Sequence, residues 1–434
     1  MVRESKSAIS LNSSQRGKSP RQLAWELLYE VENSSVYSNL ALPRALYNSD
    51  LEKRDRALVT ELVYGTLRMR GYCDSAIKRH LDRAITDIDL KVLTTLRLGA
   101  YQILIMKTPI HAAVNETVDL AKIVCGKSAS SFVNAVMRRI SENPDYAPEE
   151  FEEKYSHPRW IISAFRDLLK DEKMVEQQLI ADNAVAMPTL IPWPGRSTVE
   201  ELMESGAERI PGSTRALSFK GAPGEIPAIR DRRAGVQDLG SQMVVEKFFE
   251  TYQPNLRWLD LCAGPGGKAA YLDCLIDEGE FVANEPSSER ARLVHQVVRR
   301  GRVTSFDGRE IPDELGTFDR ILIDAPCTGI GALRRRPEVR WRRSPTDLRA
   351  LISLQGELLD SAASKLSVGG IIGYATCSPH LAETKLQVSD FLRRHSNFTR
   401  VPVSGNDDAD GDMQLWTFRD GTDCMFLSLL RKQG

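Results

Sequence analysis

The chain has 434 residues, of which 42% are hydrophobic, with 58 Lys and Arg residues against 59 Asp and Glu. At roughly 100–200 residues per domain, this length predicts two or three domains, each with a core of its own. No apolar run approaches the ~18–20 residues of a membrane span, and seven cysteines without a CxxC spacing argue against a secreted disulfide scaffold or a zinc site. We expect a cytoplasmic monomer without metal, and a formal net charge of −1 excludes nucleic-acid coating through bulk charge.

The first part of the chain has the periodicity of helices. Residues 1–20 are rich in Ser, Lys and Arg without apolar periodicity, so a disordered tail is expected there. Beyond them, apolar residues recur at helical spacing, and clear helical segments are expected over residues 92–106, 112–124 and 132–140. Because no strand-like alternation intervenes, residues 21–142 predict an all-α helical bundle.

The pattern changes twice further along the chain. Prolines punctuate short mixed elements between residues 143 and 235, which we interpret as a connecting subdomain. From residue 236 the rhythm becomes strand–turn–helix. Strands are expected at 257–261, 281–284, 320–324 and 370–376, and helices at 287–300, 347–366 and 383–394. This alternation predicts that residues 236–434 form an α/β Rossmann-like domain, in which ligands bind at the carboxyl ends of parallel strands.

A glycine-rich loop follows the first of these strands. Gly264, Gly266 and Gly267 allow close backbone approach at a strand-to-helix turn. Lys268 stands where a dinucleotide fingerprint would have its third small residue, so a mononucleoside-like ligand such as S-adenosylmethionine is favoured. Glu285 ends the next strand, where its carboxylate can accept hydrogen bonds from ribose hydroxyls.

Two cysteines follow two later strands. Cys327 lies in Asp324-Ala325-Pro326-Cys327 and Cys377 in Thr376-Cys377-Ser378, so both thiols are expected at the same sheet edge as the glycine loop. For a single cysteine, inert packing is the ordinary interpretation, but two at matching strand ends favour chemistry. Thiolate addition to C6 of a pyrimidine makes C5 nucleophilic toward a sulfonium methyl group. The base must leave its stack, and Asp324 is placed to bind the amine and ring-nitrogen edge of cytosine.

These segments resemble the Sun/Fmu/NOP2 family of RNA cytosine-5 methyltransferases. The catalytic-domain match is carried by residues 259–272, 324–331 and 374–378, and by Gly235–Gln242 leading into the domain. The helical region is similar to the NusB fold at residues 54–67, 96–102, 109–116 and 132–136. A NusB-like domain fused to this methyltransferase resembles the bacterial enzymes that modify small-subunit ribosomal RNA.

The resemblance implies roles for individual residues. Cys377 would be the nucleophile and Cys327 would assist product release, with Asp324 and Lys268 also in the active site. The cofactor contacts that it implies are Cys262, Ala263, Gly264, Pro265, Gly266, Gly267, Lys268, Glu285, Arg290, Asp307, Gly308 and Asp324. Residues 379–384 lack the acidic pair and Asn of many relatives, so no role is assigned to Glu383.

The expected function is therefore S-adenosylmethionine-dependent RNA cytosine-C5 methylation, with 16S ribosomal RNA as the first candidate substrate. Two alternatives stay open: a transfer RNA substrate, and a non-catalytic RNA-binding or antitermination-like factor that kept a methyltransferase fold. The two intact cysteines argue against the second, because a pure binder needs no pair of exposed thiols.

A cluster of arginines follows Cys327. A charge run is usually a solvated face, but its position after Cys327 predicts that it rims the catalytic crevice. Arginine forks suit phosphates, and an indole ring stacks on bases. The expected RNA-binding residues are Arg334, Arg335, Arg336, Arg340, Trp341, Arg342 and Arg343.

Overall fold

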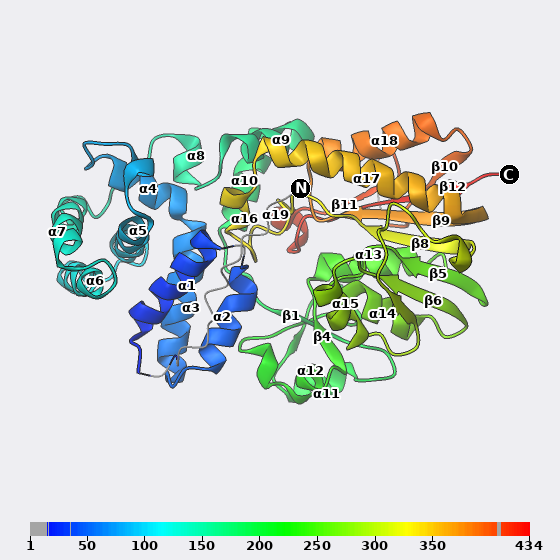
Figure 1. The fold of residues 1–434 in the computed structure, drawn as a ribbon, viewed down its shortest axis with the longest axis horizontal. Coiled ribbons are helices and arrows are strands. Elements are labelled where there is room, and N and C mark those ends of the chain that lie inside the picture. Colours follow the sequence, from blue (N-terminus) through cyan, green and yellow to red (C-terminus); the bar gives the residue numbers. More distant parts are fainter. Residues whose placement is uncertain (1–14, 16, 35, 406–408) are drawn as a thin grey trace. The chain divides into compact units, whose positions relative to one another are not determined.

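A computed structural model describes residues 15, 17–34, 36–405 and 409–434 (Figure 1). The chain divides into two compact units: the first comprises residues up to Ile162 together with Arg335–Arg342, and the second comprises Ser163–Arg334 and Arg343–Gly434. Most of the tail predicted for residues 1–20 lies outside the described residues. Its last residues are ordered, because Ser19 caps the first helix in a capping box with Gln22. None of the helices in the described part is long and apolar enough to cross a membrane.

The first unit is helical, as predicted, and its described residues contain no strand. Its elements are α1 (Pro20–Asn33), α2 (Ser38–Tyr47), α3 (Lys53–Arg68), α4 (Arg70–Lys78), η1 (Ile85–Asp87), α5 (Leu90–Leu104), α6 (Ile110–Val124), α7 (Lys127–Ser141), α8 (Phe151–Lys154) and α16 (Val339–Arg342). Helix α5 is central: every residue from Val92 to Leu104 is buried, and α1, α3, α4, α6 and α7 pack around it. The polar residues buried in α5, Arg97 among them, must therefore find partners inside the unit.

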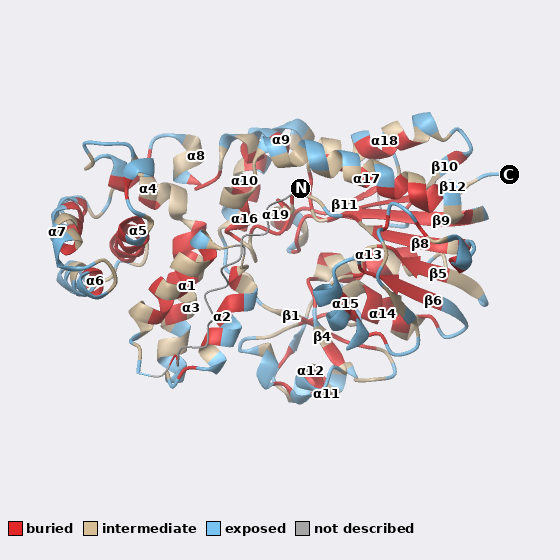
Figure 2. Cartoon of the chain, viewed as in Figure 1, coloured by how far each residue is buried: buried red, intermediate tan, exposed pale blue. Residues whose placement is uncertain are grey.

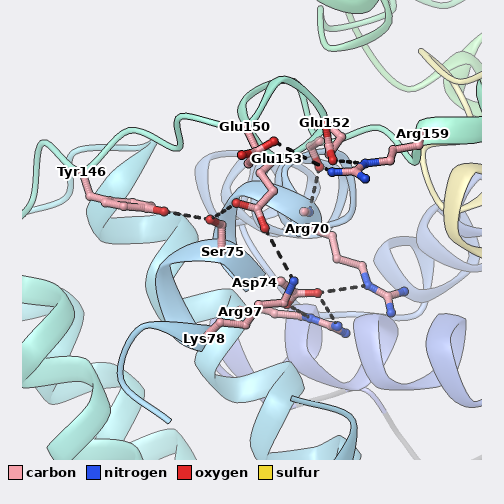
Figure 3. Close-up of polar contacts among 12 residues, drawn as sticks. Arg70, Asp74, Ser75, Lys78, Arg97, Tyr146, Glu150, Glu152, Glu153 and Arg159 are labelled. Carbon is pink, nitrogen blue, oxygen red and sulfur yellow. Dashed lines mark hydrogen bonds and ion pairs between the residues drawn. The ribbon is translucent and has the colours of Figure 1, made fainter. Parts of the chain in front are cut away.

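A buried ionic cluster joins the helices of this unit. Figure 3 shows Asp74 between Arg70 and Arg97. The guanidinium of Arg97, only 3% exposed, donates to Asp74 at 2.6 and 2.8 Å and to Glu32 at 2.5 Å. Removing one partner of such a cluster leaves a buried charge uncompensated, which typically costs about 3–5 kcal/mol.

The helical unit extends beyond the predicted boundary at residue 142. Ser75 in α4 bonds to the Tyr146 hydroxyl at 2.7 Å and to Glu153 at 2.5 Å, as Figure 3 shows. The backbone N–H of Gly71 donates to Ser156 Oγ at 2.8 Å. Residues 143–162 therefore belong to this unit because polar contacts, which carry no periodicity, hold them to α4.

The second unit contains a small antiparallel sheet in the order β2-β3-β1-β4. Its elements, with the helices that lead into it, are α9 (Arg159–Leu169), which begins in the first unit, α10 (Glu172–Asp182), β1 (Thr189–Pro192), α11 (Val199–Glu204), β2 (Glu208–Arg209), β3 (Leu217–Ser218), η2 (Pro223–Glu225), α12 (Pro227–Arg230) and β4 (Ala234–Val236). Leu190, Leu202 and Leu217 lie in a small core of its own. Within the stretch interpreted as a connecting subdomain, residues 189–236 thus form a packed sheet with a core of its own.

The remainder of this unit is built on a large sheet in the order β10-β12-β9-β8-β5-β6-β7, with β11 paired to β12. Its elements are α13 (Leu239–Phe249), β5 (Leu256–Asp260), α14 (Gly267–Leu275), β6 (Gly279–Asn284), α15 (Ser288–His295), β7 (Arg302–Thr304), η3 (Asp313–Leu315), β8 (Phe318–Asp324), α17 (Pro345–Lys365), β9 (Leu366–Thr376), η4 (Leu381–Glu383), α18 (Lys385–Arg394), β10 (Phe398–Val401), β11 (Met413–Gln414), α19 (Thr417–Asp420) and β12 (Phe426–Lys432). The α/β Rossmann-like prediction is confirmed, with one difference: β10, β11 and β12 add an antiparallel edge to the expected parallel sheet.

Alternating side chains of the strands supply two separate cores. Trp258 and Leu322 pack with helices α13 and α14, whereas Leu259 and Ile321 pack with α17 and α18. Figure 1 shows these helix pairs on opposite faces of the sheet, and Figure 2 shows its central strands as largely buried. Because β5 has parallel partners on both sides, β6 and β8, the chain reverses direction of winding here. Ligands of such sheets bind outside the carboxyl ends of the strands at this point.

Candidate active site

The glycine loop occupies the carboxyl end of β5 and leads into α14. Gly266 caps the helix with φ +114°, a left-handed conformation that favours glycine. A Cβ atom on Gly264 would lie 2.1 Å from Glu285 Oε2, so no larger side chain fits there. The tight turn predicted from the sequence is therefore required by the backbone and by its neighbour Glu285.

Glu285 is the first residue after β6 and is 3% exposed. Its carboxylate accepts hydrogen bonds from the backbone N–H groups of Gly264 at 3.1 Å and Ser287 at 3.0 Å. Arg290 pairs with the same carboxylate at 3.1 Å and donates to the Gly264 carbonyl at 2.5 Å. Three predicted cofactor residues, Gly264, Glu285 and Arg290, are thus brought together.

Asn284 explains how this strand end is fixed. The side chain is fully buried, and its amide donates to the carbonyls of Leu261 at 3.2 Å and Phe306 at 3.1 Å. Its Oδ1 accepts from the Phe306 N–H at 3.0 Å. Asn284 thus links the segments that follow β5 and β7. An apolar residue, which is ordinary at this position, could not form these bonds.

Asp260, at the end of β5, was not identified from the sequence. Its side chain is fully buried, Oδ1 accepts from the Cys262 N–H at 3.3 Å, and Oδ2 has no hydrogen-bond partner among the described residues. Burial, followed by the charge of Asp324, raises the pKa of Asp260 to about 7. A buried acceptor that lacks a donor beside a glycine loop fits a ligand that brings a cationic or N–H group. The sequence signal was an acid within an otherwise apolar strand.

Asp307 and Gly308 follow β7. Asp307 is half exposed and pairs with Arg309 at 2.6 Å, and the hydrogen bonds from Arg309 lower the pKa of Asp307 to about 2. A Cβ atom on Gly308 would approach Leu358 to 2.8 Å. Asp307 is therefore held as a carboxylate, and its contact with a cofactor stays a prediction.

Lys268 and Asp324 form an ion pair across neighbouring strands. The ammonium in the first turn of α14 lies 2.8 Å from Asp324 Oδ2 at the end of β8, and 3.3 Å from Ser241 Oγ. Burial lowers the pKa of Lys268, but the charge and hydrogen bond of Asp324, followed by the negative charge of a Cys377 thiolate, raise it on balance. Lys268 therefore stays protonated, and its positive charge favours the thiolate form of Cys377.

The two cysteines meet, as the sequence predicts, beyond the ends of two adjacent parallel strands. Asp324 of β8 is the register partner of Ala375 of β9, and the Sγ atoms of Cys327 and Cys377 lie 3.4 Å apart without a disulfide bond between them. Hydrogen bonding to Cys377, together with burial, raises the pKa of Cys327 well above its usual value. Cys327 is therefore a thiol that resists ionisation.

Glu383, for which no role is predicted from the sequence, bonds to Thr328, the residue that follows Cys327. The side chain is fully buried, and its carboxylate accepts from the Thr328 N–H at 2.8 Å and from Thr328 Oγ1 at 2.5 Å. Gln355 donates to it at 3.2 Å. The only available signal was an acid six residues after Cys377, without the motif around it that relatives share.

The predicted arginine patch is placed differently, because Arg335–Arg342 packs within the helical unit. Arg340 is fully buried and donates to the carbonyls of Arg68 at 3.1 Å and Ser156 at 3.0 Å. Trp341 donates to the Leu67 carbonyl at 3.2 Å, with Arg70 over its ring at 5.2 Å. The expectation of an exposed phosphate ligand at Arg340 is therefore wrong, since this side chain satisfies internal carbonyls.

Neighbouring members of the patch are also engaged. Arg342 donates to the carbonyls of Val31 and Val36, and the guanidinium of Arg336 lies 5.4 Å from the centre of the Tyr37 ring. Arg334, in the second unit, pairs with Asp238 at 3.6 Å. These residues, with Arg335 and Arg343, are partly exposed, so RNA contact by them stays a prediction. Across the described residues, no cluster of His, Cys, Asp and Glu is suited to hold a metal ion.

Comparison with known proteins agrees with this geometry. Residues 250–431 match the family described as 16S rRNA methyltransferase RsmB/F, and residues 18–142 match the NusB family. A putative methyltransferase of Mycobacterium tuberculosis is 41% identical over 446 residues, covering 95% of this chain and 96% of its own length. A probable ribosomal RNA small subunit methyltransferase B of Synechocystis is 30% identical over 411 residues, covering 88% and 91%.

A solved structure shows the same fold. The crystal structure of PH0851 aligns with a TM-score of 0.83 at 24% identity and covers 96% of this chain and 99% of its own. With both family matches and the full-length relatives, the chain belongs to the RsmB/F family of methyltransferases and carries a NusB-family domain in its helical unit.

Proposed function

We propose that this protein is an S-adenosylmethionine-dependent RNA methyltransferase that modifies carbon 5 of cytosine in 16S ribosomal RNA. The observation that carries the proposal is the pair of reduced thiols, Cys327 and Cys377, 3.4 Å apart at the carboxyl edge of the sheet. The Lys268–Asp324 ion pair lies at the same edge. A plain binding protein has no use for two thiols beside a buried cation.

The glycine loop and its acidic neighbours fit the cofactor. Glu285 is the residue that would accept the ribose hydroxyls, and the unpartnered Oδ2 of Asp260 suits the cationic amine of the methionine part. Cys262–Lys268, Arg290, Asp307, Gly308 and Asp324 complete the proposed binding residues. When bound, S-adenosylmethionine supplies an electrophilic sulfonium methyl group.

Cys377 is the proposed nucleophile. Its thiolate, favoured by Lys268, adds to C6 of the cytosine, and the electron pair of the C5=C6 bond becomes available at C5 for methylation. Loss of the C5 proton and cleavage of the Sγ–C6 bond then restore the aromatic base. Cys327, whose thiol resists ionisation, assists this release as a hydrogen-bond donor.

Asp324 and Lys268 are proposed to orient the base. A carboxylate at this position accepts from the cytosine amine, and uracil has no amine to offer. The target base must leave its stack to reach a site at the sheet edge. The ion pair would thus combine base selection with stabilisation of charge on the ring.

The names of the relatives favour ribosomal RNA over transfer RNA as the substrate. The test uses purified protein, methyl-labelled S-adenosylmethionine and unmodified small-subunit ribosomal RNA, followed by digestion to nucleosides. We expect label in 5-methylcytidine. Label in another nucleoside would overturn the chemistry, label only in transfer RNA would move the substrate, and no label in either RNA would favour a non-catalytic binder.

A further inference from the structure

One buried carboxylate fixes both residues that flank Cys327. Glu383 Oε1 accepts the Thr328 N–H at 2.8 Å, and Oε2 accepts the Thr328 hydroxyl at 2.5 Å. Gln355 Nε2 donates both to Glu383 at 3.2 Å and to the Pro326 carbonyl at 2.9 Å. The backbone on either side of Cys327 is therefore held directly by Glu383 or through one amide.

The same carboxylate reaches the loop of the other cysteine. Thr328 Oγ1 lies 3.1 Å from Ser378 Oγ, and Ser378 immediately follows Cys377. Tyr374, fully buried in β9, donates to the Glu383 carbonyl at 2.8 Å. The two cysteine loops and strand β9 are thus joined through one residue, which explains how two half-buried sulfurs are kept 3.4 Å apart.

The charge of Glu383 also affects how readily the Cys327 thiol loses its proton. The hydrogen bond to Cys377 and burial raise the pKa of the Cys327 thiol most, and the charge of Glu383 adds to them. Lys268, by contrast, favours a thiolate at Cys377. Both effects favour Cys327 over Cys377 as the donor in the 3.4 Å contact between the two sulfur atoms. A hydrogen-bond donor at Cys327 would stabilise the Cys377 sulfur when its bond to C6 of the base breaks.

We propose that Glu383 is a positioning residue that holds the Cys327 thiol against Cys377 and so accelerates release of the covalent RNA adduct. The proposal rests on the function proposed above. In the release step, water takes the C5 proton and the C–H electron pair forms the C5=C6 bond. The Sγ–C6 bond breaks with its electrons on Cys377, and the thiol of Cys327 stabilises the departing thiolate by hydrogen bonding.

The test compares Glu383→Ala and Glu383→Gln with wild type in single-turnover reactions with ribosomal RNA, following the denaturation-resistant protein–RNA adduct. With Ala, we expect adduct decay to slow about tenfold while adduct formation changes less than about threefold, since small misplacements of reacting groups cost such factors. Gln keeps the shape and most hydrogen bonds, so it should restore release to within about threefold of wild type. Equal effects on formation and release, or no rescue by Gln, would overturn the proposal.

Two additions keep the test decisive. Asp273→Asn is the matched control, because Asp273 is as buried as Glu383 and accepts from the backbone N–H groups of residues 299–301, which belong to neither cysteine loop. It should lower the unfolding temperature without slowing adduct decay. If Glu383→Ala does not fold, Thr328→Val removes the hydroxyl that joins Glu383 to Ser378 and should itself slow release.

A readout without RNA separates this proposal from the proposed function. Alkylation by iodoacetamide, followed peptide by peptide with mass spectrometry, reports the Cys327 thiol directly. Cys327 should react at least about threefold faster in Glu383→Ala than in wild type, because one of the charges that disfavour its thiolate is removed and the loop around it is loosened. If the variant shows faster alkylation but the protein methylates no RNA, only the proposed function is refuted. If alkylation of Cys327 is unchanged, the positioning role of Glu383 is refuted.

Discussion

The Sγ atoms of Cys327 and Cys377 lie 3.4 Å apart although 50 residues separate them in the chain. Their strands, β8 and β9, are adjacent and parallel, with Asp324 in register with Ala375. The two strands therefore end level with each other, and both cysteines follow at the same edge of the sheet. Their surroundings differ. Lys268 favours a thiolate at Cys377, whereas the hydrogen bond to Cys377, burial and the charge of Glu383 disfavour a thiolate at Cys327.

This difference predicts opposite behaviour for the two cysteine variants. Cys327→Ala should still form the covalent RNA adduct but release it slowly, so a protein–RNA species should accumulate in denaturing gels. Cys377→Ala should form no adduct, because the attacking thiolate is absent. Quantifying labelled RNA that migrates with the protein after incubation with S-adenosylmethionine measures both.

The double variant supplies the control for that experiment, since it should resemble Cys377→Ala. Accumulation in Cys377→Ala instead of Cys327→Ala would invert the roles. Accumulation in neither, together with normal folding, would revive the non-catalytic RNA-binding protein.

The close approach of Gly264 to Glu285 predicts a defect in cofactor binding. In Gly264→Ala the new Cβ would lie 2.1 Å from the Glu285 carboxylate, which must move and lose its bond to the Gly264 N–H. We expect the Kd for S-adenosylmethionine, measured by calorimetry, to rise by at least about tenfold, or about 1.4 kcal/mol. Gly224→Ala is the matched control, because nothing lies within 4 Å of a Cβ atom there. Equal affinities in the two variants would show that Glu285 does not hold the cofactor.

Much of this fold was predictable from local patterns. Apolar residues at helical spacing predicted α5, α6 and α7 to within a few residues, and the four expected parallel strands all exist. The antiparallel edge was missed because the apolar run of β12 (Phe426–Lys432) has no alternation that distinguishes a strand from a buried helix. Helix α15 ends earlier than expected, because Asp273 accepts the N–H groups of residues 299–301 and holds a loop there.

The site residues were predictable where their position follows from the end of a parallel strand. Cys327, Cys377, Lys268 and Asp324 meet because parallel strands end at one edge. Glu383 and the arginine patch were different, since their roles depend on partners that share no local pattern with them. Arg340, for example, bonds to carbonyls 272 and 184 residues away, and no spacing in the sequence reveals that.

Asp260 predicts a pH dependence of stability in the protein without cofactor. Its pKa is raised from near 4 to about 7, so the folded state binds an extra proton between these values. Stability from this group is complete below about pH 4 and is lost as the pH rises toward and through about 7. At about 1.4 kcal/mol per pKa unit, the loss is at most about 4 kcal/mol. Urea unfolding of wild type and Asp260→Asn at pH 5 and pH 8 measures it, because the Asn variant should show a shallower fall. If the unfolding free energy changed equally between pH 5 and pH 8 in both proteins, Asp260 would stay ionised when buried.

The burial of Arg340 predicts a structural role in place of RNA contact. Arg340→Met keeps the apolar stem but leaves the carbonyls of Arg68 and Ser156 without their donor. We expect a loss of about 2 kcal/mol in the free energy of unfolding and faster hydrogen exchange in α3. The exposed Arg349, changed to Met, is the matched control and should alter neither. If Arg340→Met instead weakened RNA binding at unchanged stability, Arg340 would have to leave its buried position to contact phosphate, and the arginine patch would regain its predicted function.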